Sequence, residues 1–165
     1  QAALSYIRAK SKEYGLLNNL FDENEVHIHF LQAAIPKDGP SAGVAIVSSL
    51  LSAFRQQTMQ EKIAMTGEIS LHGRVLPVGG LKEKLLAAQR EGMKSVILPS
   101  ANEAYVQNLS ANVKKGLKLI FVDNYEQAYG FLFPDQSKSS SNECDYPLVN
   151  KKRAGGKLSS DLAID

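Results

Sequence analysis

Short apolar segments of strand length alternate along this chain with longer segments of helical length. Five segments are predicted strands: residues 26–30, 63–69, 75–78, 95–98 and 117–122. After the first 25 residues, four segments are predicted helices: residues 41–54, 81–91, 102–109 and 124–133. Strands and helices in alternation predict an α/β domain. The turn at His72-Gly73 would join two strands in a hairpin, so we expect a mixed sheet with flanking helices.

The first residues predict a helix that is already under way, because Ala2, Leu4 and Ile7 recur with helical spacing and no cap precedes them. Gly15 is expected to end this helix, and residues 16–23 are a predicted loop. We therefore expect the chain to be a fragment of a longer polypeptide.

A chain of 165 residues is long enough for one domain with a sizeable core. Its character changes after Pro134, where a serine-rich stretch over 137–142 is followed by a basic cluster over 151–157. Few apolar side chains are available there to offset the entropy of ordering. We predict a domain over residues 1–135 and a flexible tail over residues 136–165. The basic cluster is either a solvated terminus or a site for an acidic partner.

Composition argues against several classes of protein. The net charge of +2 arises from 19 basic and 17 acidic residues spread along the chain, which gives no case for binding nucleic acid or a membrane. The single cysteine, Cys144, forms no internal disulfide, which suits a reducing intracellular compartment. No apolar run reaches the roughly 18 residues that span a bilayer, and the charged opening is not typical of a signal peptide.

The strongest chemical signal lies in residues 36–43 (PKDGPSAG). Two prolines and a glycine restrict this loop, so Ser41 is predicted at a defined helix N-terminus. The unpaired N–H groups and the positive dipole end at such a position would stabilise a tetrahedral oxyanion. The small Ala42 and Gly43 would let a substrate backbone approach closely. Ser41 is therefore a candidate nucleophile, although a serine at this position also commonly serves only as a helix cap.

Lys84 is the candidate base for this serine. It lies on the apolar side of the predicted helix 81–91, whereas Lys82 lies about 200° around the helix and should point to water. Burial would lower the pKa of the Lys84 ammonium, as a general base near neutral pH requires. Thr66, at the end of a predicted strand, would hold the amine by a hydrogen bond. The other interpretation is a surface lysine whose stem alone is buried.

A serine activated by a lysine can cleave an amide bond without a histidine. The chain has only three histidines, and two of them, His27 and His29, share one face of a predicted strand. They are either exposed strand residues or two ligands of a metal, and no third ligand has a convincing spacing. The sequence thus predicts a peptidase with no metal site.

Two further patterns are weaker. Asp38 and Glu68 form either an acid pair or the polar ends of a turn and a strand. Gly79-Gly80 before a helix resembles a phosphate cradle only faintly, and the motif Gly-x-x-x-x-Gly-Lys-Ser/Thr does not occur. We therefore predict no cofactor within this chain.

Three motifs are similar to those of a known family: residues 36–43 (PKDGPSAG), 65–70 (MTGEIS) and 76–88 (LPVGGLKEKLLAA). In this order and spacing they resemble the proteolytic domains of Lon proteases, which are ATP-dependent Ser-Lys peptidases. The resemblance covers about residues 2–134 and is to the soluble A-type of the family. It implies the Lon proteolytic-domain fold, with the first strands of that fold expected before Gln1.

The resemblance also implies roles for single residues. Ser41 matches the family nucleophile, and Lys84, the second lysine of GLKEK, matches its general base. The residues that would support this dyad are Thr66, Asp38, Gly39 and Pro40. The chain departs from the family at residues 31–33 (LQA), where the usual pattern is Pro-x-Gly.

For the whole protein, the resemblance implies degradation of misfolded, damaged or regulatory proteins. ATP and Mg²⁺ would bind an AAA+ ATPase module outside this chain. The full-length protein would form a homohexameric ring with its peptidase sites facing a chamber, whereas the fragment would be monomeric or weakly associating. Two alternatives stay open: a non-catalytic oligomerisation module of the same fold, and an ATP-independent Ser-Lys peptidase.

The compartment follows from the resemblance only loosely. The family works in the bacterial cytoplasm and in the matrix of mitochondria and peroxisomes. Residues 27–30 (HIHF) and Gly43-Val44 are more similar to the peroxisomal branch, although the chain ends in Ala-Ile-Asp and not in a Ser-Lys-Leu signal. We expect an organelle matrix, peroxisome ahead of mitochondrion, with the bacterial cytoplasm as the alternative.

Overall fold

A three-stranded parallel sheet lies at the centre of the domain. The structure is a computed structural model that describes residues 2–17, 19–28 and 40–134. Within them the strands β1 (Ile63–Met65), β4 (Ser95–Pro99) and β5 (Lys118–Val122) lie side by side in the order β1-β4-β5. Both pairs are parallel, with Ser95 opposite Ile63 on one side and Lys118 on the other. Helices connect these strands, because parallel neighbours need a long crossover. The α/β prediction is confirmed.

The predicted strand 63–69 is divided into two strands that belong to different sheets. Its second part, β2 (Glu68–Ile69), pairs antiparallel with β3 (Val75–Leu76). The division falls at Gly67, whose N–H donates to the Ser41 carbonyl at 2.9 Å and whose own carbonyl accepts from Val44 N–H at 3.1 Å. Because the Gly67 backbone bonds outside the sheet, the parallel and antiparallel parts that we expected in one mixed sheet are separate sheets.

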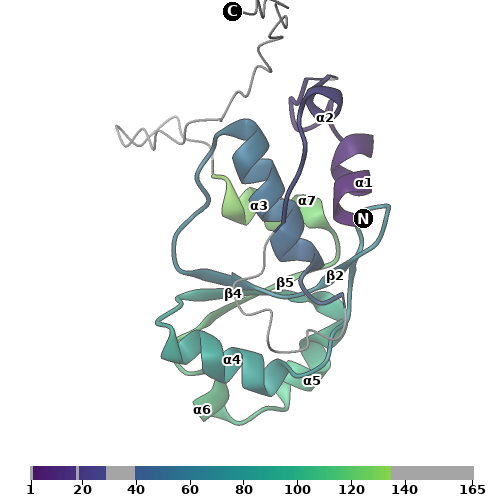
Figure 1. Cartoon of the computed structure of the whole chain (residues 1–165). Coiled ribbons are helices and arrows are strands. Elements are labelled where there is room, and N and C mark those ends of the chain that lie inside the picture. The colour runs from purple at the N-terminus through teal and green to yellow at the C-terminus, as the bar shows by residue number, and fades with distance from the viewer. Residues whose placement is uncertain (1, 18, 29–39, 135–165) are drawn as a thin grey trace, which may run out of the picture.

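Helices cover both sides of the parallel sheet (Figure 1). On one side lie α1 (Ala2–Ala9), α3 (Gly43–Arg55) and α7 (Tyr125–Leu132). On the other side lie α4 (Leu81–Arg90), α5 (Glu103–Gln107) and α6 (Ala111–Lys114). Alternate strand residues face the two layers, so the sheet separates two cores.

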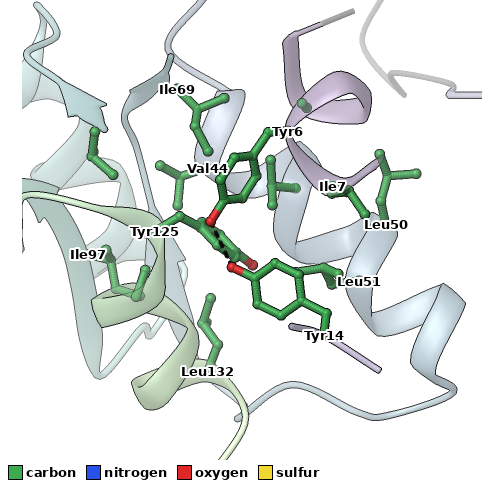
Figure 2. Close-up of a cluster of buried hydrophobic side chains, with 14 of the residues drawn as sticks. Tyr6, Ile7, Tyr14, Val44, Leu50, Leu51, Ile69, Ile97, Tyr125 and Leu132 are labelled. Atoms are coloured by element: carbon green, nitrogen blue, oxygen red, sulfur yellow. Dashed lines mark hydrogen bonds between the residues drawn. The ribbon is translucent and has the colours of Figure 1, made fainter. Parts of the chain in front are cut away.

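The first core, formed by the buried side chains of α1, α3, α7 and the facing strand residues, is rich in tyrosine. Figure 2 shows the rings of Tyr6, Tyr14 and Tyr125 gathered between the helices. The Tyr6 and Tyr14 hydroxyls form a hydrogen bond of 2.7 Å. Tyr125 donates to the Ser48 hydroxyl at 2.9 Å, and Ser48 donates to the Val44 carbonyl at 2.8 Å. Each buried hydroxyl thus has a partner, as burial of a polar group requires.

The second core, on the α4 side, contains only aliphatic side chains among its fully buried members. They are Leu81, Leu85, Ala88, Val96, Leu98, Val106 and Val113. At about 25 cal/mol per Å² of apolar area, burial of such side chains is the main stabilisation that this layer can offer.

Most predicted elements occur with small changes in their ends, but the prediction that Gly15 ends the first helix is wrong, because α1 ends at Ala9 and residues 10–15 form turns. The predicted helices 81–91 and 124–133 are α4 and α7, and the predicted strands 95–98 and 117–122 are β4 and β5. The helix predicted over 102–109 is shorter, because η1 (Ser100–Asn102) precedes a five-residue α5. Two helices were not predicted: α6, and α2 (Leu20–Glu23) within the predicted loop 16–23.

One predicted strand is wrong in its described part. Residues 24–28 have no strand structure, and the rest of the predicted strand 26–30 lies outside the described residues. The alternation of Val26, His27 and Ile28 fits a strand, but none of the described strands pairs with this segment. The predicted tail 136–165 also lies outside the described residues, so the boundary at residue 135 stays a prediction. No helix in the described part of the chain is long and apolar enough to cross a membrane.

Candidate active site

Ser41 lies in a tight turn just before α3. Gly43 N–H donates to the Pro40 carbonyl at 3.0 Å, and Ala42 has φ −90° and ψ 3°. These values are those of a type I turn with Ser41 and Ala42 as its central residues. The prediction that the helix begins at Ser41 is therefore wrong by two residues. The N-cap is Ala42, so Ser41 is not the helix cap that its position in the sequence also allowed.

Two groups on the strand side hold the backbone of this turn. The Ser41 carbonyl accepts from Gly67 N–H at 2.9 Å and from the Thr66 hydroxyl at 3.3 Å. Val44 N–H closes the arrangement by donating to the Gly67 carbonyl at 3.1 Å. Ser41 lines a cavity, and no hydrogen bond of its side-chain hydroxyl occurs among the described residues.

Two glycines allow α3 to lie this close to the β1–β2 junction. A Cβ atom on Gly43 would be 2.7 Å from the Ile69 nitrogen, and one on Gly67 would be 2.7 Å from a Val75 methyl and 2.9 Å from a Val44 methyl. We expected the small size of Gly43 to serve a substrate. The structure shows a packing role, because Gly43 is buried against Ile69; Gly43 also lines the cavity, so its role towards a substrate stays a prediction. The role of Gly67 was missed, and its only signal was a glycine directly after an apolar strand.

The helix α4 brings Lys84 to the same place from the other layer. Gly80 precedes the helix with φ +66°, a conformation that suits glycine, and its carbonyl accepts from Lys84 N–H at 3.1 Å. Leu81 and Leu85 are buried in the second core. The predicted difference between the two lysines is confirmed, because Lys84 is half-buried and Lys82 is exposed.

The amine of Lys84 is held as the sequence predicted. Its Nζ donates to the Thr66 hydroxyl at 3.2 Å. Burial lowers the pKa of Lys84 below its ordinary value. No acidic side chain in the described ranges forms an ion pair with Lys84, and a carboxylate there would have raised the pKa instead.

Ser41, Thr66 and Lys84 line one cavity of about 1000 Å³. Its surface is mostly apolar, and among the described residues only Lys84, Glu68 and Glu91 contribute charged side chains to it. Within the same residues no hydrogen bond joins the Ser41 hydroxyl to Lys84 Nζ directly. The Thr66 hydroxyl accepts from Lys84 Nζ and donates to the Ser41 backbone carbonyl. A hydroxyl and a partly desolvated amine in one apolar cavity are the groups that acyl transfer to serine requires.

The other candidates are only partly described. Asp38, Gly39 and His29 lie outside the described residues, so neither the acid pair of Asp38 with Glu68 nor the histidine pair is tested. In the ranges that the structure covers, no group of three or more metal-binding side chains occurs. Pro40 is the first residue of the Ser41 turn and lines the cavity, and its supporting role stays a prediction.

Comparison with known proteins adds independent information. Residues 1–133 match the family described as Lon protease (S16) C-terminal proteolytic domain. The chain is 52% identical over 130 residues to the Lon protease of Aquifex aeolicus, an alignment that covers 78% of this chain and 16% of that protein. It is 48% identical over 127 residues to the Lon protease of Heliobacterium modesticaldum, with coverage of 77% and 16%.

A longer alignment relates the chain to the Lon protease of Syntrophomonas wolfei, which is 40% identical over 163 residues. It covers 98% of this chain and 20% of that relative. The chain thus spans a fifth or less of the length of these three relatives, all of them bacterial.

Proposed function

The chain belongs to the family of Lon protease C-terminal proteolytic domains, and from this membership we propose that it cleaves peptide bonds with Ser41 as nucleophile and Lys84 as general base. The observation that carries this assignment is the hydrogen-bonded series from Lys84 Nζ through the Thr66 hydroxyl to the Ser41 carbonyl. It joins the two proposed catalytic residues, which come from different helical layers, inside one cavity.

Thr66 fixes the direction in which the Lys84 amine acts. The Thr66 hydroxyl donates its one proton to the Ser41 carbonyl, so it can only accept from Lys84. A neutral Lys84 amine that donates one N–H to Thr66 keeps a lone pair for the Ser41 proton. The lowered pKa of Lys84, which burial causes, increases the share of this neutral form. Thr66 is therefore proposed as the residue that positions the base.

The reaction begins when Lys84 accepts the Ser41 hydroxyl proton and the oxygen attacks the substrate carbonyl. Lys84 then gives this proton to the leaving amine, an acyl-serine forms, and water hydrolyses it by the same steps in reverse order. Gly43 and Val44 N–H groups already have carbonyl acceptors. The N–H groups of Ser41 and Ala42 have none among the described residues, so we assign these two as the candidate donors to the oxyanion.

Single substitutions in the complete protein test the assignment. Ser41→Ala and Lys84→Met should each abolish cleavage of a fluorogenic peptide, and the double variant should lose little more, because the pair acts as a unit. Lys82→Ala is the matched control, since this lysine is on the same helix but exposed, and it should keep full activity. Cleavage that persists in Ser41→Ala would contradict the nucleophile. Unchanged ring assembly without any cleavage, even in the unsubstituted protein, would favour a non-catalytic oligomerisation module.

The activity of the whole protein is a proposal of wider scope. We propose that this domain works in an ATP-dependent protease that degrades misfolded, damaged or regulatory proteins. ATP and Mg²⁺ would bind an ATPase module outside this chain, and the complete protein would form a homohexamer. The three relatives named above bear the name Lon protease, which supports this proposal. Protein degradation with and without ATP, together with the mass of the assembly by light scattering, tests it.

We propose an intracellular site of action, because the three relatives are bacterial proteins of this family. They give no support to the preference for an organelle matrix that the sequence resemblance suggested. Imaging of the tagged complete protein decides between the compartments. Signal in peroxisomes or mitochondria would support the organelle-matrix hypothesis, and diffuse signal would contradict it.

A further inference from the structure

One face of α4 continues the candidate active site beyond Lys84. Lys84, Ala87, Ala88 and Glu91 all line the cavity, at the spacing i, i+3, i+4 and i+7 that puts residues on one side of a helix. Glu91 is exposed and directly follows the last helical residue, with its N–H bonded to the Ala87 carbonyl at 3.0 Å. The cavity is therefore lined along α4 from Lys84 to Glu91.

The charge at the Glu91 end is negative from two sources. The Glu91 carboxylate has no ion-pair partner among the described residues. The C-terminal end of α4 adds the negative end of the helix dipole, which favours a nearby cation. The neighbouring Arg90 and Lys94 are exposed but are not among the residues that line the cavity. This end of the cavity thus favours a positive group.

The surroundings of Glu91 also fit the shape of a basic side chain. Ala87 is small, and the half-buried Met93 lines the same end of the cavity. A lysine or arginine side chain has an apolar stem and a charged head, so it can lie along an apolar surface and place its charge at a carboxylate. Arginine and lysine are therefore better complements to this end than a purely apolar residue.

The distance along the helix relates this end to a position in a peptide. Seven residues at a rise of 1.5 Å put Glu91 about 10 Å from Lys84 along the axis. An extended peptide advances about 3.3 Å per residue, so this distance corresponds to about three residues. A side chain about three positions from the scissile bond would reach Glu91.

We propose that Glu91 is a specificity-determining residue that favours peptide substrates with lysine or arginine about three positions from the scissile bond. This inference rests on the proposed peptidase function and adds a substrate class to it. The effect is modest because the carboxylate is exposed: an exposed ion pair changes an equilibrium by about 1.4- to 5-fold. We expect a change of this size in kcat/KM, and it should decrease in 1 M salt, where the Debye length is about 3 Å.

The test uses the complete protein and fluorogenic peptides of one sequence. Lysine is moved through the three positions on each side of the scissile bond and compared at each position with the uncharged norleucine and with glutamate. At the third residue from the scissile bond, on one of its two sides, we expect lysine to be favoured about 1.4- to 5-fold over norleucine. Glutamate should be disfavoured at the same position. Glu91→Gln should bring the ratio of kcat/KM for the lysine and norleucine peptides to about one. Glu91→Lys should reverse the preference.

Glu83→Gln is the matched control, because Glu83 is an exposed glutamate of the same helix that does not line the cavity. It should keep the lysine preference. A flat profile in the unsubstituted protein, or a lysine preference that survives in Glu91→Gln, would overturn the specificity role while the peptidase assignment stands. Loss of the preference in Glu83→Gln would also overturn it. If the unsubstituted protein cleaves no peptide of the series, the result contradicts the peptidase assignment itself, and with it the specificity role that rests on it.

Discussion

The two cores on either side of the parallel sheet are built from different chemistry. The first core holds three buried tyrosines and a buried serine, and its hydroxyls form hydrogen bonds between elements that are far apart in sequence, such as Tyr125 and Ser48. The second core is aliphatic, with leucines, valines and an alanine from short helices and the facing strands. Hydrogen bonds between buried side chains help to fix relative positions in the first core, whereas the second core is packed by apolar contacts and its directional bonds, such as those from Gln89 to the Asn112 and Lys115 carbonyls, lie at the surface.

The candidate active site lies where these two layers meet. Ser41 precedes α3 of the first layer, and Lys84 belongs to α4 of the second. The end of β1 stands between them, because Thr66 contacts both residues and Gly67 holds the Ser41 carbonyl. Any shift of one layer relative to the other would therefore change the distance between the proposed nucleophile and the proposed base.

The largest expected effect comes from a cavity in each core. Leu51 and Leu85 are both fully buried, one in each core. Leu51→Ala and Leu85→Ala should each lower the free energy of unfolding by about 2–5 kcal/mol. Urea unfolding followed by fluorescence and circular dichroism measures both. We expect one cooperative transition, and two separate transitions would show that the layers unfold independently.

A smaller loss of stability with a large loss of activity should follow from Gly43→Ala. The added Cβ would be 2.7 Å from a backbone nitrogen of Ile69, which cannot move away as a side-chain end can. We expect a cost of about 1–3 kcal/mol. Displacement of the Ser41 turn by about 1 Å should lower kcat on the order of 100-fold.

Gly79→Ala provides the control for this change. A Cβ atom on Gly79 would have no other atom within 4 Å, and the φ of this residue is not in the left-handed region. The Gly43→Ala and Gly79→Ala variants should therefore differ clearly from each other in peptide cleavage and in thermal unfolding. Equal activity in the two variants would contradict the role of the close Gly43–Ile69 contact.

The hydroxyls of Tyr125 and Ser48 in the first core should show a coupling energy in unfolding. The buried aliphatic side chains of the second core have no hydroxyls that could show one. Tyr125→Phe removes one buried hydrogen bond and should cost about 1 kcal/mol. Ser48→Ala leaves the Tyr125 hydroxyl buried without this partner and should cost about 1–3 kcal/mol. The double variant should lose less than the sum of the two. A double-mutant cycle by urea unfolding measures the difference, and strict additivity would mean that the two hydroxyls do not interact.

Alkaline pH should change the stability contributions of Tyr6, in the first layer, and of Lys84, in the second layer, in opposite directions. Burial raises the pKa of Tyr6 from 10.0 to about 12, so its folded form stays protonated where the unfolded form ionises. This contribution is fully present below pH 10 and is lost as the pH rises through about 12. For Lys84 the folded pKa is lowered below 10.5, so the unfolded state binds more protons in the interval up to 10.5, and stability rises with pH there.

Comparison with Lys84→Met isolates the contribution of Lys84 to this pH dependence. The difference in unfolding free energy between the unsubstituted protein and Lys84→Met should move in favour of the unsubstituted protein as the pH rises towards 10.5. Chemical unfolding at a series of pH values measures it. A difference that is constant with pH would contradict the lowered pKa of Lys84.

Local sequence determined most element types in this chain. The end of α4 before Gly92 and the ends of β4 at Pro99 and of α7 before Pro134 follow from the conformations that glycine and proline favour or exclude. The side of α4 on which Lys84 lies follows from the period of the helix. The identities of Ser41, Lys84 and Thr66 as candidates also required only motifs of a few residues.

Tertiary structure alone decided how these pieces meet. The split between β1 and β2 depends on Gly67, whose backbone bonds to Ser41 and Val44, about 25 residues earlier in the chain. Ser41 is not a helix cap, because its turn is fixed by those same contacts. The two cavity carboxylates, Glu68 and Glu91, come from different elements and share no motif. Local propensity acts between neighbours in sequence, whereas these features arise from contacts between segments that only the folded chain brings together.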